Sequence, residues 1–264
     1  MLVRDRETGM SHESLIRDQF TRQATPFSTA PAISDEQALR MMLDAARPTP
    51  HDTVLDLACG GGLIVCAFAP RVRHATGIDL TPAMLARARD LAAEKKLDNV
   101  SWHEGDVRAL PWPDAAFSIV VTRFSLHHLT DPLRTVREMA RVCRPGGRVV
   151  VADMYASEDP DKAAAWNRLE VLRDPSHVRS LSLTELKALF PAAGLPAPEV
   201  TFYELRSDVD SLLARSFPNP GDEQRIVALF AAQAERDSMG IEVRSDNGRL
   251  RYAYPVAILA STRP

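Results

Sequence analysis

The sequence is poor in three features: basic charge, long hydrophobic runs and cysteine. Its 32 Lys and Arg residues are outnumbered by 35 Asp and Glu residues, which gives a net charge of −3. Without a broad basic surface, nucleic acid is not the expected partner. No run approaches the roughly 18 apolar residues that a membrane span needs, so no transmembrane segment is predicted.

The three cysteines, Cys59, Cys66 and Cys143, are odd in number and lack C-x-x-C spacing. They indicate neither a disulfide framework nor a zinc site, and no set of His and carboxylate residues has the spacing of metal ligands. Residues 1–14 contain no apolar signal-peptide core, and Met10 is an alternative start. We therefore expect a cytoplasmic protein without a bound metal.

What is present is an ordinary globular composition, with 45% hydrophobic and 25% charged residues in a chain of 264. This length and composition predict a single domain. Between residues 51 and 154, short apolar runs alternate with helical patterns, as in a doubly wound parallel sheet with helices on both faces. The predicted strands are 53–57, 74–79, 100–103, 117–122 and 148–152, and the predicted helices are 63–69, 82–96 and 132–141.

The flanking regions carry weaker patterns. We expect helices over 13–23 and 35–46, further helices over 155–172 and 209–239, a strand near 200–205 and a last strand within 254–262. Helix starts are indicated by Thr81 and Asp131, each followed by proline, and by capping-box spacing at Ser34 and Ser182. Residues 144–147, Arg-Pro-Gly-Gly, predict a turn.

The most informative segment is Val-Leu-Asp-Leu-Ala-Cys-Gly-Gly-Gly at 54–62, an apolar strand that runs into a glycine-rich turn. Glycine lets the backbone approach a ligand closely, and open α/β sheets bind ligands at the carboxyl ends of central strands. Asp79 ends the second predicted strand, and Asp106 follows the third. With Asp56, these acids should converge on one crevice, where Asp79 can accept the hydroxyls of a ribose.

A dinucleotide site is the rival interpretation of such a turn, since it also uses glycines between a strand and a helix. Here Gly60, Gly61 and Gly62 are followed by Leu-Ile-Val, so the third glycine of that fingerprint is missing. Asp56 before the turn also opposes a pyrophosphate. A ligand with an amino group and a positive charge suits this carboxylate better.

These motifs, with GIDLTPAML, GDVRALPWPDAAFSIVVTRFSLHHL and RPGGRVVVAD, resemble those of class I S-adenosylmethionine (SAM)-dependent methyltransferases. Within that family the chain is similar to the small-molecule branch that includes the ubiquinone/menaquinone biosynthesis C-methyltransferases. The resemblance covers residues 50–155. It implies a Rossmann-like, seven-stranded, mostly parallel sheet. One methyltransferase domain would then comprise an N-terminal helical lid (1–50), a SAM-binding core (51–154) and a C-terminal helical cap (155–264).

The resemblance also implies which residues bind SAM, whose product is S-adenosylhomocysteine. Those lining the methionine part would be Asp56, Ala58, Gly60 and Gly62, with Ala58 in place of the family's usual glycine. Asp79 would hold the ribose, and the adenine would lie among Leu80, Met84, Asp106 and Val107. Thr122 and Arg123 would lie beside the cofactor, and Phe20 or Phe27 of the lid would pack on it.

The pair His127-His128 follows the fourth predicted strand and should overlook the methyl group of SAM. Methyl transfer mainly needs alignment of donor and acceptor and exclusion of water, and a histidine can serve as general base. Either histidine is therefore a candidate base. The alternative is that each is structural, with its ring packed inside and bonded to the backbone.

We expect methyl transfer to O, N or an activated C of a small organic molecule, a secondary metabolite or cofactor precursor. One alternative is a SAM-fold protein with a non-methylating reaction such as cyclisation. Another is an RNA or protein methyltransferase, although residues 122–125 lack the Asn/Asp-Pro-Pro-Tyr/Phe motif of many base N-methyltransferases. The sequence leaves open the acceptor atom and the oligomeric state, for which a homodimer is one option.

Overall fold

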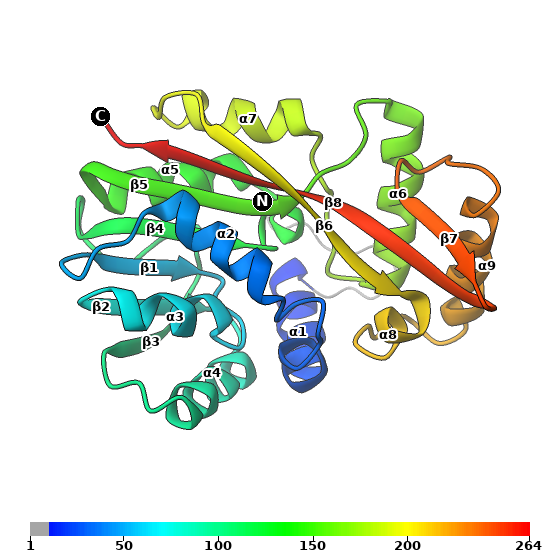
Figure 1. Ribbon diagram of the computed structural model, residues 1–264, viewed down its shortest axis with the longest axis horizontal. Coiled ribbons are helices and arrows are strands. Elements are labelled where there is room, and N and C mark those ends of the chain that lie inside the picture. The colour runs from blue at the N-terminus through cyan, green and yellow to red at the C-terminus, as the bar shows by residue number, and fades with distance from the viewer. Residues whose placement is uncertain (1–10) are drawn as a thin grey trace.

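Eight strands form the sheet of this protein in the order β3-β2-β1-β4-β5-β8-β6, with β7 paired to β8 (Figure 1). The computed structural model describes residues 11–264, so the alternative start at Met10 lies outside the described residues. Strands β1 to β5 pair in parallel, whereas β8 is antiparallel to β5, β6 and β7. The strands are β1 (Thr53–Leu57), β2 (His74–Asp79), β3 (Val100–Glu104), β4 (Phe117–Arg123), β5 (Cys143–Met154), β6 (Glu199–Asp208), β7 (Glu242–Asp246) and β8 (Arg249–Thr262).

Helices cover both faces of this sheet. On β1, Val54 packs among residues of α2, α3 and α4, whereas Leu55 and Leu57 pack among residues of α5 and α7. Because neighbouring strand residues point to opposite faces and helices cover both, β1 buries apolar side chains on both sides, Val54 on one and Leu55 and Leu57 on the other. The predicted doubly wound α/β fold is confirmed. The helices are α1 (His12–Ser28), α2 (Glu36–Ala46), α3 (Leu63–Phe68), α4 (Pro82–Glu94), α5 (Pro132–Val142), α6 (Pro160–Arg173), α7 (Leu183–Ala192), α8 (Val209–Leu213) and α9 (Asp222–Gln233).

The predicted count of seven strands is wrong by one, because β7 and the first part of β8 form a hairpin that the sequence interpretation missed. Asn247 and Gly248, between the two strands, have φ of 50° and 78°. Asn-Gly is the preferred pair for a two-residue hairpin turn because both residues tolerate positive φ. Strand β8 consequently begins at Arg249 rather than near Tyr254.

Three local predictions also need correction. The segment 144–147 is not a turn outside the sheet but a bulge within β5, since Phe117 pairs with Cys143 and Ile119 with Arg148. Asp35, not Ser34, caps α2 through a bond from the Ala38 amide. The predicted helix over 209–239 is two helices, α8 and α9. The capping box at Ser182 is confirmed.

Helix α1 and the elements α6, α8, α9 and β7 lie toward the same end of the sheet, opposite to the C-terminal end of β8 (Figure 1). Helix α1 packs against α4 and lies between α4 and α8, while α6, α9 and β7 gather at the right of Figure 1. Among residues 11–264, none of the helices has the length and hydropathy required to cross a lipid bilayer. The strand ends of β1 to β4 open toward α1, where the site described next is found.

Candidate active site

The turn between β1 and α3 is shaped by three residues with positive φ. Ala58, Gly60 and Gly62 have φ of 51°, 50° and 80°, a region that glycine enters freely and other residues enter at a cost of about 1–2 kcal/mol. A Cβ atom on Gly62 would lie 2.7 Å from the Trp102 ring and 2.8 Å from the Ala88 Cβ. Gly62 therefore permits close packing of α3 rather than contact with a ligand.

Asp79, the last residue of β2, fixes this turn. Its Oδ2 accepts a hydrogen bond from the Gly60 amide and its Oδ1 one from the Thr81 amide, both at 2.8 Å. Burial raises the pKa of Asp79, against the lowering effect of these hydrogen bonds. Each carboxylate oxygen keeps a second lone pair, so Asp79 can still accept from a ligand.

A large cavity lies across the carboxyl ends of β1 to β4 and under α1. The predicted site residues that line it are Phe27, Asp56, Ala58, Gly60, Asp79, Leu80, Met84, Asp106, Val107, Arg123 and His128. Three others do not line it: Gly62 is packed behind the turn, the Thr122 hydroxyl donates to the Leu57 carbonyl, and His127 faces a neighbouring cavity. We call the large cavity the donor cavity.

Two side chains of opposite charge line the donor cavity with polar atoms that have no hydrogen-bond partner among residues 11–264. Asp56 is 1% exposed and its Oδ2 accepts no hydrogen bond from the described residues, and Arg123 is 8% exposed with unpartnered Nε and Nη2. Burial, and then repulsion by Asp79, raises the pKa of Asp56 well above its usual range. Because buried charges without partners are costly, the pair suits a ligand that carries both an ammonium and a carboxylate.

Helix α1 is tied to the end of β3 by ion pairs. Arg108 donates to both oxygens of Asp106 at 2.7–2.9 Å and lies 3.8 Å from Glu13 of α1. Arg17 of α1 pairs with Glu104 at 3.1 Å. Although burial raises the pKa of Asp106, the Arg108 hydrogen bonds lower it overall. Each partly exposed ion pair contributes at most about 1 kcal/mol to stability. These ion pairs therefore hold α1 only weakly at the edge of the sheet.

A second, smaller cavity adjoins the donor cavity, and we call it the inner cavity. Five residues line both cavities: Phe20, Phe27, Ile33, Phe124 and His128. The other residues of the inner cavity are Gln23, His127, Met154, Arg173, Asp174, Leu205, Leu212, Arg215 and Tyr254. Since the two spaces share a wall, a group bound in one lies next to a group bound in the other.

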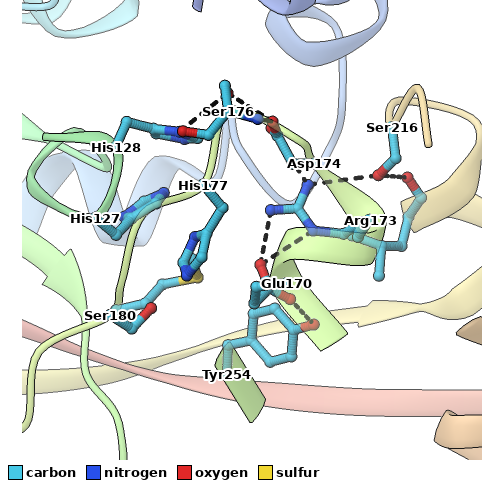
Figure 2. A network of polar contacts seen from close by, with 12 residues as sticks. His127, His128, Glu170, Arg173, Asp174, Ser176, His177, Ser180, Ser216 and Tyr254 are labelled. Atoms are coloured by element: carbon cyan, nitrogen blue, oxygen red, sulfur yellow. Dashed lines mark hydrogen bonds and ion pairs between the residues drawn. The ribbon is translucent and has the colours of Figure 1, made fainter. Parts of the chain in front are cut away.

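A buried network of polar contacts stiffens the inner cavity (Figure 2). Glu170 of α6, 0% exposed, accepts from Arg173 Nη2 and from the Tyr254 hydroxyl, each at 2.7 Å. Asp174 accepts from the Ser176 hydroxyl at 2.6 Å, and Figure 2 shows Ser176 lying between Asp174 and the neighbouring histidine ring. Charge-assisted hydrogen bonds of this kind are the strong ones, so these side chains are fixed in place.

The adjacent histidines have different partners. His127 Nδ1 lies 2.6 Å from Asp153 Oδ1, and His128 Nδ1 lies 3.1 Å from the Ser176 carbonyl oxygen. A carboxylate and a carbonyl only accept, so we assign the proton to Nδ1 in both rings and leave Nε2 as an acceptor. Burial, followed by repulsion from His127, lowers the pKa of His128 to about 4. Of the two, only His128 lines both cavities.

Several residues of the inner cavity were missed from the sequence, among them Arg173, Gln23 and Arg215. Gln23 donates to Asp174 at 2.9 Å and thus joins α1 to the loop after α6. A signal for it exists, because Phe20, Gln23 and Phe27 are spaced three and four apart and share one helical face. Arg215 has no comparable signal.

No group of metal-ligating side chains suited to an ion was found among residues 11–264.

A glycine-rich turn after β1, an acid at the end of β2 and a cavity across the parallel strand ends define a Rossmann-like, nucleoside-binding enzyme. Residues 55–151 match the family model described as "Methyltransferase domain". Over 232 residues the chain is 34% identical to the "Uncharacterized methyltransferase YcgJ" of Bacillus subtilis, covering 87% of this chain and 91% of that protein. The chain belongs to the class I SAM-dependent methyltransferases, and SAM is its cofactor.

Other comparisons agree with this assignment. The crystal structure of the YcgJ protein superposes with a TM-score of 0.78 at 33% identity, covering 86% of this chain and 99% of that one. A "Ubiquinone/menaquinone biosynthesis C-methyltransferase UbiE" of Roseobacter denitrificans is 35% identical over 129 residues, 48% of this chain and 52% of that protein. Geranyl diphosphate C-methyltransferase from Streptomyces coelicolor, crystallised with S-adenosylhomocysteine, shares the fold, with a TM-score of 0.62 at 19% identity over 87% of this chain and 79% of that one.

The charges of the donor cavity and the space beside Gly60 suit SAM. The amino acid part of SAM carries an ammonium and a carboxylate, which match the unpartnered atoms of Asp56 and Arg123. Gly60 leaves room for close approach, because the first atom that a Cβ there would meet is the Met84 sulfur at 3.8 Å. The side chains present are therefore able to hold this cofactor.

Proposed function

We propose that this enzyme transfers the methyl group of SAM to an oxygen, nitrogen or activated carbon of a small organic molecule. The supporting observation is the wall that the donor and inner cavities share, which would place the acceptor beside the cofactor. The inner cavity is smaller than the donor cavity and is lined by residues of α1, α6, α8 and β8. Such a space suits a metabolite rather than a macromolecule.

In this proposal SAM supplies an electrophilic methyl group. The protein binds SAM and the acceptor, aligns them and excludes water from the site. Arg123 and Asp56 hold the amino acid part, while Asp79 accepts from the ribose hydroxyls. Helix α1, as the lid, carries Phe20 and Phe27 over both cavities and excludes water from the transfer. Residues 155–264 act as the cap that shapes the acceptor space. Alignment and exclusion of water account for most of the acceleration that such a transfer needs.

We assign the base role to His128 rather than His127. Its ring lines both cavities, and its lowered pKa leaves it neutral at pH 7, so Nε2 can accept a hydrogen bond from the methyl acceptor. It can then take up the proton that becomes strongly acidic as the acceptor atom gains the methyl group. His127 is buried against Asp153 and lines only the inner cavity.

A cytoplasmic location, supported by three free cysteines, is part of the same proposal.

The decisive test is calorimetric titration with SAM and S-adenosylhomocysteine, followed by a screen of small acceptors with isotope-labelled SAM. The Asp79→Ala variant should lose SAM affinity by about tenfold to a hundredfold, because it removes a charged hydrogen-bond acceptor. Asp90→Ala, the same change at an exposed site of α4, is the matched control. Wild-type binding without transfer to any small acceptor in the screen, but with transfer to RNA or protein, would overturn the small-molecule assignment.

A further inference from the structure

The inner cavity contains two buried arginines whose surroundings differ. Arg173, 9% exposed, donates twice to Glu170 and lies 3.9 Å from Asp174. Arg215, 6% exposed and just beyond α8, forms no ion pair with any carboxylate of residues 11–264. The first arginine is thus neutralised by contacting carboxylates, whereas no carboxylate of residues 11–264 lies within ion-pair distance of the second. Hydrogen bonds from the first turn of α8, and to a smaller extent the charge of Arg215, lower the pKa of nearby Asp208.

Neutral groups hold Arg215 in position. Its Nη1 donates to the Ser211 carbonyl at 2.9 Å and to the Ser207 hydroxyl at 3.5 Å, and its Nη2 donates to the Tyr252 hydroxyl at 2.9 Å. Its Nε–H has no hydrogen-bond partner within the described part of the chain. A guanidinium has five N–H donors and stays protonated in proteins. Positive charge and unused donors therefore remain at the cavity wall.

The acids near Arg215 are engaged elsewhere. Asp208 caps α8, and its two oxygens accept from the amide and hydroxyl of Ser211 at 2.8 Å. Asp174 accepts from the amide and hydroxyl of Ser176 and from Gln23. Because a buried guanidinium without a counterion is costly, an anionic group of a ligand would stabilise Arg215.

The rest of the inner cavity is mostly apolar. Its walls include Phe20, Phe124, Leu205 and Leu212, and it meets the donor cavity at His128. A ligand that fills it therefore has a hydrocarbon or aromatic body. One end of that body lies beside His128 and the donor cavity, and a polar end can reach Arg215.

We propose that the methyl acceptor is a small, largely apolar molecule with one carboxylate, which binds Arg215 while the atom to be methylated lies toward His128. The proposal rests on the proposed function, since it takes the inner cavity as the acceptor site. Carboxylates match the planar donor geometry of arginine. One unpaired guanidinium balances one negative charge, so a diphosphate is not the expected group.

The test uses two fluorescent probes with the same aromatic frame, added to protein saturated with S-adenosylhomocysteine. One probe, 8-anilinonaphthalene-1-sulfonate, carries a single negative charge, and N-phenyl-1-naphthylamine is neutral. Wild-type protein should bind the sulfonate about tenfold more tightly than the neutral probe, and Arg215→Gln should abolish that preference without changing neutral-probe affinity by more than about twofold. Arg225→Gln, which removes an exposed arginine of α9, should change neither affinity.

Equal binding of both probes by the wild-type protein, or an unchanged preference in Arg215→Gln, would overturn the proposal. If that variant does not fold, Arg215→Lys replaces it and should retain the charge preference with weaker sulfonate binding, about threefold to tenfold. Titration with S-adenosylhomocysteine distinguishes failure of the proposed function from failure of the acceptor assignment. Absence of this binding contradicts the proposed function, whereas normal binding without anion preference contradicts only the acceptor class.

Discussion

The donor and inner cavities are built in different ways. The acids and glycines of the donor cavity lie at the carboxyl ends of β1, β2 and β3 or just beyond them, so their positions depend on the order of the strands. The inner cavity depends on contacts between distant segments, such as Gln23 with Asp174, 151 positions apart, and Glu170 with Tyr254, 84 apart. We infer that SAM binding tolerates change in the inner cavity, whereas acceptor choice depends on it.

The strongest test of this separation is Glu170→Ala. It leaves Arg173 and the Tyr254 hydroxyl without their buried acceptor, so the free energy of unfolding should fall by about 3–5 kcal/mol, measured by urea denaturation. SAM affinity of the folded variant should change by less than about threefold. Glu204→Ala, which removes an exposed partner of Arg206, is the control. A parallel loss of SAM affinity would show that the cavities are coupled.

A pH titration tests the residue shared by both cavities. The pKa of His128 is lowered from 6.5 to about 4 in the folded state, so below pH 6.5 the unfolded chain takes up a proton that the folded chain does not. Between pH 7 and pH 4, wild-type protein should therefore lose about 3 kcal/mol more stability than His128→Gln. The exposed His51→Gln serves as control. Identical pH profiles of the wild-type protein and His128→Gln would contradict this.

Arg123→Met sharpens the assignment of the donor cavity. We expect affinity for S-adenosylhomocysteine to fall about tenfold to a hundredfold, since a charged hydrogen bond contributes roughly 1.5–3 kcal/mol. Binding of 5′-methylthioadenosine, which lacks the amino acid part, should be unchanged. Calorimetry of both ligands on both proteins gives the comparison. An equal loss for the two ligands would place Arg123 outside the carboxylate site.

The smallest expected effect is that of Ala58→Gly. Ala58 has φ of 51°, and glycine relieves a cost of about 1 kcal/mol there. The free energy of unfolding should rise by up to that amount, while SAM affinity stays within about twofold. Thermal unfolding and calorimetry measure the two quantities. Weaker SAM binding by the glycine variant would mean that the methyl group of Ala58 contacts the cofactor.

Much of the fold was predictable because the core strands are marked locally. Strands β1 and β2 have the predicted bounds, and β3 and β4 end one residue later than predicted. Strands β1 and β4 are mainly apolar or β-branched runs, and all four strands are bounded by turn residues or helix starts. The β7–β8 hairpin was missed although Asn247-Gly248 signals it, because its flanking strands are polar and largely exposed.

The sequence alone determined the donor half of this enzyme: the strand ends, the glycine turn and the acids that meet there. Parallel strands bring their carboxyl ends to one edge of the sheet, so residues at the ends of successive strands lie close together although they are far apart in the sequence. Only the tertiary structure decided that His128 is shared by both cavities, that Arg108 engages Asp106, and that Arg215 contacts no carboxylate of residues 11–264. Whether a buried charge is paired depends on side chains from distant segments, and no local pattern encodes that.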